Sequence, residues 1–156
     1  MYTYILVTEE FLIANELQDG DESDLYDSLC DYLEQYGIKH AVKVEDNEIK
    51  EIIEELKQSL TSNIKQNKDD SYTFTVTKKE AKAKLNKKIE DILKQAENFS
   101  KNKNFENFIS LKNKLNDDRF LFLFDFYDKD LEELLFEVVE GNPITFTVKT
   151  IYETVE

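Results

Sequence analysis

The segment RFLFLFDFY, residues 119–127, constrains the fold more than any other part of the chain. Apolar side chains alternate along it, so that Phe120, Phe122, Phe124 and Phe126 fall on one face of an extended strand. Burying such a face is worth several kcal/mol, because each phenylalanine removes a large apolar area from water. The sequence therefore predicts a strand whose Phe face lies in a core and is covered by other elements.

Strand-like and helix-like patterns alternate along the rest of the chain, with apolar residues at a spacing of two or of three and four. The expected strands are residues 2–8, 40–45, 71–77, 119–127 and 144–155. The expected helices are residues 24–36, 46–60, 78–99 and 128–141, with a short one bearing Phe105, Phe108, Ile109 and Leu115. Residues 9–17 are ambiguous between helix and strand, and residues 62–71 are expected to form a loop.

This order predicts an α+β fold in which one globular domain, residues 1–156, contains a mixed β-sheet of about five strands packed with about five helices. The chain has only three Gly, and none forms a Gly-rich turn from a strand into a helix. That argues against a nucleotide-binding doubly wound fold.

Composition narrows the class of protein. With 40% hydrophobic residues the chain is globular rather than disordered, and no apolar run approaches the roughly 20 residues that span a bilayer. A single Cys excludes an internal disulfide, and the N-terminal apolar run has no basic segment before it, so we expect a cytoplasmic protein without a signal peptide. The net charge of −14 argues against direct binding to nucleic acid or to an anionic membrane.

The charge is also unevenly distributed. Residues 1–60 contain 16 acids and 4 lysines, residues 61–114 contain 7 acids and 13 lysines, and residues 115–156 contain 11 acids and 3 basic residues. Such asymmetry between segments indicates an interaction surface more than uniform acidity would. We expect the partner of this surface to be basic.

Three expected helices each carry a row of acids spaced three and four residues apart. In the first of them the acids fall within a sector of about 80°, opposite the apolar side chains. The rows are Asp24, Asp27, Asp31 and Glu34; Glu48, Glu51 and Glu55; and Asp130, Glu133 and Glu137. Like charges at these spacings destabilise a helix by about 0.2–0.5 kcal/mol per pair. Since the sequence accepts that cost, these residues are the candidate partner-binding set.

A metal site is the main alternative chemistry. Cys30 and His40, the only residues of their types, could bind zinc with nearby carboxylates, although structural zinc usually takes all four ligands from Cys and His. Glu48-Ile49-Lys50 resembles the E-x-K tripeptide of restriction-like nucleases, but here it opens a helix instead of lying on a strand. Asp125 interrupts the Phe-rich strand, where a metal-dependent hydrolase can place a carboxylate. The expectation remains a protein without a cofactor and without catalytic residues.

In size, acidity and lack of a catalytic motif, the whole chain resembles the small phage-encoded inhibitors of host defence, which include DNA-mimicking anti-restriction and anti-CRISPR proteins. The resemblance rests on composition over the full length, and no motif is shared. It implies a non-enzymatic inhibitor, a monomer or small homo-oligomer, that occupies the basic nucleic-acid-binding surface of a nuclease or CRISPR effector. A housekeeping or structural interaction protein with another partner is the alternative.

Overall fold

The computed structural model of the chain describes residues 2–17, 22–102, 109, 119–125 and 127–155. Its strands are β1 (Tyr4–Thr8), β2 (His40–Lys43), β3 (Ile64–Gln66), β4 (Tyr72–Val76), β5 (Phe120–Leu123), β6 (Asp128–Asp130) and β7 (Ile144–Val155). Its helices are α1 (Glu9–Ala14), α2 (Glu22–Glu34), α3 (Asp46–Ser59), α4 (Lys78–Asn102) and α6 (Leu131–Glu140). A mixed sheet packed with helices confirms the predicted α+β class.

The last strand, β7, organises the sheet. It pairs antiparallel with β1 along one edge, and with β4 and then β2 along the other edge. The order of the main path is β3-β4-β7-β1-β5-β6, and among the described strands only the β1–β5 pair is parallel. Because β7 has 12 residues, it is long enough to pair with two strands in succession on the same edge.

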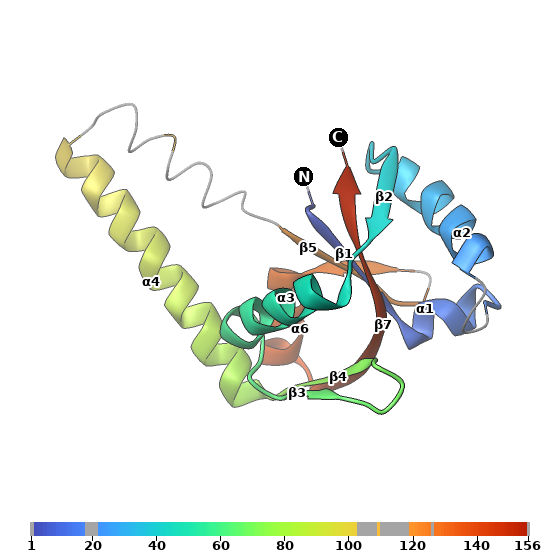
Figure 1. Cartoon of the computed structure of the whole chain (residues 1–156). Coiled ribbons are helices and arrows are strands. Elements are labelled where there is room, and N and C mark those ends of the chain that lie inside the picture. The colour runs from blue at the N-terminus through green and yellow to red at the C-terminus, as the bar shows by residue number, and fades with distance from the viewer. Residues whose placement is uncertain (1, 18–21, 103–108, 110–118, 126, 156) are drawn as a thin grey trace.

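Both faces of the sheet are buried (Figure 1). On one face, Phe120, Phe122 and Phe124 pack with apolar residues of β1, β4 and β7 under α3 and α6. These three rings are 4%, 0% and 1% exposed, which confirms the predicted Phe face for them, whereas Phe126 lies outside the described residues. On the other face, Leu121 packs with apolar residues of β1 and β7 under α1 and α2.

One predicted loop and one predicted helix boundary were wrong. The loop expected over residues 62–71 contains β3, which pairs with β4 through a turn in which Asp70 has a φ of 66°. The sequence did not predict this strand, because it has three residues and only Ile64 is apolar and partly buried, which is too short a pattern to show alternation. The helix expected from Asp128 begins at Leu131, because Asp128–Asp130 forms β6 against β5.

The structure also decides the ambiguous segment 9–17, and it describes only part of the region after α4. The ambiguous segment 9–17 contains a helix, α1, whose N-cap Thr8 accepts a hydrogen bond from the Phe11 backbone N–H. The helix α4 is 25 residues long, packs against α6, and extends outward beyond the sheet (Figure 1). The short helix predicted after it lies outside the described residues except for Ile109.

Candidate functional site

The acidic face of α2 is the first candidate site. Its apolar residues Leu29 and Leu33 are buried against the sheet at 0% and 1% exposure. This orientation follows from the amphipathic spacing and turns the opposite side of the helix to solvent. Every acid of the predicted row is exposed: Asp24, Asp27, Asp31 and Glu34. None of the four forms an ion pair with another described residue.

The helices α1 and α2 contribute acids but no Lys or Arg to this layer. The chain has ten Asp and Glu residues and no Lys or Arg before Lys39. Since α1 and α2 both come from that part of the chain, neither helix carries a positive side chain. The face that they form therefore presents negative charge that its own helices do not neutralise.

The row on α3 is only partly free of internal contacts. Glu48 and Glu51 are exposed, but Glu55 is half-buried and forms an ion pair with Arg119, which lies just before β5. The Arg119 guanidinium also lies over two aromatic rings, 5.6 Å from the centroid of Tyr4 and 5.8 Å from that of Phe120. Glu55 thus contributes to packing at the end of the sheet.

The acids of the row on α6 form contacts within the helix and with the neighbouring strand β6. Asp130 is the N-cap and accepts a hydrogen bond of 2.8 Å from the Glu133 backbone N–H, and Glu133 completes a capping box. Partial burial and the hydrogen bond with Asp130 raise the pKa of Glu133 above its ordinary value. Glu137 forms an ion pair with Lys129. These acids therefore stabilise the start of α6 and its contact with β6.

The three rows are not on one surface. The helix α2 covers one face of the sheet, whereas α3 and α6 cover the other. Sequence alone could not decide this, because the face that a helix covers depends on the course of the whole chain. Of the predicted partner-binding residues, the α2 set alone forms a complete row whose acids make no ion pair with another described residue.

The residues of the predicted metal site lie on neighbouring elements. Cys30 is half-buried on α2, and its hydrogen bond with Tyr26 raises the pKa of that phenol. His40 is exposed at the first position of β2. Within residues 2–17, 22–102, 109, 119–125 and 127–155, no group of three or more His, Cys, Asp or Glu residues has the arrangement of a metal site.

The structure also shows where the candidate residues of a metal-dependent hydrolase lie. Asp125 is exposed two residues after the end of β5, between β5 and β6. Glu48 and Lys50 lie in the first two turns of α3, as predicted, rather than on a strand. The described residues around them form no metal-ligand cluster.

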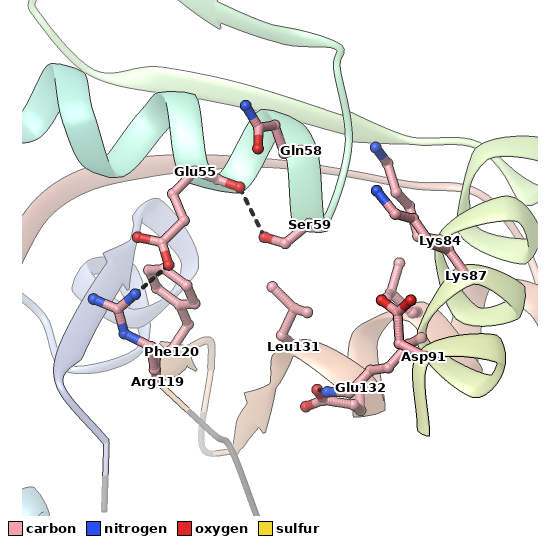
Figure 2. Close-up of a pocket in the computed structure, with 12 residues that line it drawn as sticks. Glu55, Gln58, Ser59, Lys84, Lys87, Asp91, Arg119, Phe120, Leu131 and Glu132 are labelled. Atoms are coloured by element: carbon pink, nitrogen blue, oxygen red, sulfur yellow. Dashed lines mark hydrogen bonds and ion pairs between the residues drawn. The ribbon is translucent and has the colours of Figure 1, made fainter. Parts of the chain in front are cut away.

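A second candidate site is a cavity of about 310 Å³ between α3, α4, α6 and the start of β5. Its walls differ in chemistry. Phe120, Leu131 and Leu135 supply an apolar surface, and polar or charged residues of α3 and α4 surround it (Figure 2). In Figure 2, Lys84 and Lys87 extend from α4 toward the side of the cavity that Gln58 forms.

The sequence predicts a helix over residues 78–99 within the lysine-rich segment 61–114, but it did not predict this cavity. A signal was present, because Lys84, Lys87, Lys88 and Asp91 follow one another at helical spacing beside the apolar stripe of α4. The opposite wall could not be predicted, since Glu55 and Arg119 are 64 residues apart in the chain.

Comparisons with known proteins gave no match, whether with models of protein families, with curated proteins or with solved structures. A search of the described helices found none with the length and apolar character needed to cross a membrane.

Proposed function

We propose that the protein is a non-enzymatic acidic binding protein of the cytoplasm that docks the exposed face of α2 on a basic, nucleic-acid-binding surface of another protein. By occupying that surface it excludes the nucleic acid, so it acts as an inhibitor of a nuclease or CRISPR effector. The observation that carries the proposal is the α1–α2 layer, because the two helices contain seven acids and no Lys or Arg.

The geometry of α2 supports this role. Asp24, Asp27 and Asp31 are spaced at i, i+3 and i+7 on an exposed helix, so their Cβ atoms lie about 5–6 Å apart. Such a row offers carboxylates to a basic groove at intervals of the same order as the phosphates of a nucleic-acid backbone. Complementary charge of this kind steers association and raises its rate, mainly at low ionic strength.

The test is a competition experiment with two variants that lose the same charge. The first variant replaces the α2 row: Asp24→Asn, Asp27→Asn, Asp31→Asn and Glu34→Gln. The matched control removes four exposed acids from other elements: Glu54→Gln, Glu90→Gln, Glu97→Gln and Glu140→Gln. Each protein is titrated into complexes of nucleases, RNA-guided effectors included, with labelled nucleic acid, at low and at moderate salt.

Wild type and the control should displace nucleic acid from a susceptible nuclease and lose potency as salt rises. The α2 variant should fail to displace it, although its unfolding free energy is unchanged or slightly raised, since like-charge neighbours are removed from an exposed helix. Equal potency of the α2 variant and wild type would show that another surface makes the contact. Displacement that is insensitive to salt would also contradict the proposal.

A further inference from the structure

The cavity between α3, α4 and α6 has a chemistry that the acidic α2 face does not explain. We infer that it binds a small organic anion, in which a carboxylate or phosphate group is attached to an apolar body. This site lies on the opposite face of the sheet from α2, so the inference is independent of the proposed function.

Size and lining favour a small organic ligand. A volume of about 310 Å³ is at the lower end of the range of roughly 300–1,000 Å³ for ligand pockets. The apolar wall consists of Phe120, Leu131 and Leu135, whose exposed fractions are only 4%, 8% and 1%. An apolar ligand body placed there would cover the remaining accessible area of this wall and gain the corresponding transfer free energy.

Two of the three acids of the lining form ion pairs, and the third, Asp91, is not without a partner. Glu55 forms an ion pair with Arg119, and Glu132 forms one with Lys88. Each of these pairs joins two different elements across the cavity wall. An entering cation would have to compete with the Arg119 and Lys88 side chains for these carboxylates, which disfavours a cationic ligand.

Two basic side chains remain for a ligand. Lys84 and Lys87 are three residues apart on α4, so their Cβ atoms lie about 5–6 Å from each other on one side of the helix. Within the part of the chain that the structure describes, neither forms an ion pair with a carboxylate. The Lys84 ammonium group donates a hydrogen bond to the Lys57 carbonyl oxygen, which is a neutral acceptor, and at 3.4 Å the bond is long.

These two ammonium groups bring positive charge to a cavity of a protein whose net charge is −14. An anionic group between them would form charge-assisted hydrogen bonds, with the Gln58 amide N–H on the facing helix as a further neutral donor. Its apolar body would then lie toward Phe120 and Leu131. The order of groups from α4 to β5 thus matches an anion joined to an apolar body.

The experiment is a heteronuclear NMR titration of the full chain with probes that share a phenyl body. Phenylacetate and phenyl phosphate are the anionic probes, phenethyl alcohol is the neutral probe, and phenethylamine is the cationic probe. The test variant is Lys84→Met with Lys87→Met. The control is Lys82→Met with Lys94→Met, which removes the same charge from exposed positions of α4 outside the cavity.

The anionic probes should shift the amide signals of residues 84–91 and 119–120, and the neutral and cationic probes should bind about tenfold more weakly or not at all. The test variant should weaken phenylacetate binding about tenfold, and the control should leave it unchanged. Preference for phenyl phosphate would identify the natural ligand as a phosphate, and preference for phenylacetate would identify a carboxylate.

Three results would overturn the inference. One is equal affinity for phenylacetate and phenethyl alcohol, since the charge would then have no role. Another is equal affinity of the test variant and the control for the anionic probes. The third is the absence of any shift around the cavity with either anion at millimolar concentration.

Discussion

Replacing Phe124 with Ala tests the core that the Phe-rich strand builds. The side chain is 1% exposed and belongs to the cluster beneath α3 and α6. Its ring lies edge-on to Phe146 with the centroids 5.2 Å apart, and it stacks on Tyr127 with the centroids 5.5 Å apart. Truncation therefore removes apolar burial and two aromatic contacts at once.

The expected loss in the free energy of unfolding is about 3–5 kcal/mol, the usual cost of a Phe→Ala change in a core. The aromatic pairs account for about 0.5–1.5 kcal/mol each beyond the area that they bury, which places Phe124 in the upper part of that range. A domain of this size is stable by only about 5–15 kcal/mol, so the variant should retain a fold of much reduced stability.

Urea denaturation followed by circular dichroism measures the effect. With a slope of about 2 kcal/mol per molar urea, a loss of about 4 kcal/mol moves the midpoint down by about 2 M. The matched control is Phe136→Ala on α6, because Phe136 is 60% exposed and the same atoms are removed from a solvated position. That variant should lose less than about 1 kcal/mol.

A loss below about 1 kcal/mol for Phe124→Ala would refute the reasoning, because it would mean that the Phe face does not carry the core. A similar loss in both variants would also refute it, since exposure would then not decide the cost. A changed slope of the urea transition would indicate an altered denatured state, and the comparison would then rest on Phe122→Ala, whose side chain is 0% exposed.

Two further changes test local contacts. Thr8→Val should lower the free energy of unfolding by about 1–3 kcal/mol in urea denaturation, because the buried Thr8 hydroxyl donates a hydrogen bond of 2.7 Å to the Leu123 carbonyl and caps α1. The control Thr145→Val, at an exposed position, should change it by under about 0.5 kcal/mol, and equal effects would exclude the capping role. Burial and the hydrogen bond of 2.9 Å to Asp128 raise the pKa of Tyr32 above its ordinary 10.0. The contribution of the protonated phenol to stability is therefore complete below pH 10 and is lost as the pH rises further. In the Tyr32→Phe variant the unfolding free energy should fall less steeply above pH 10 than in wild type, and identical slopes would contradict the assignment.

The sequence alone determined which segments form helices and strands, where their side chains alternate or repeat at helical spacing. The Phe-rich strand and helix α3 are examples, because the spacing of the apolar side chains in each of them fits one type of element only. Where the pattern is short, the prediction failed. The strands β3 and β6 have three residues each, and only pairing with β4 and β5 makes them strands.

The candidate sites were predictable to different degrees. The exposure of Asp24, Asp27 and Asp31 follows from the amphipathic spacing of α2, so the sequence determined that these acids face solvent. For Glu55 the same spacing was misleading, because Arg119 lies beside it only in the folded chain.

Tertiary structure alone decided how the sheet is ordered and which helix covers which face. The pairing of β1 with both β5 and β7 brings together segments more than a hundred residues apart, and no local pattern specifies such partners. That order places α2 on one face of the sheet and α3 and α6 on the other, which separates the acidic rows. It also forms the cavity between α3, α4 and α6, because Glu55 on α3, Lys84 on α4 and Arg119 before β5 line the same cavity only in the folded chain.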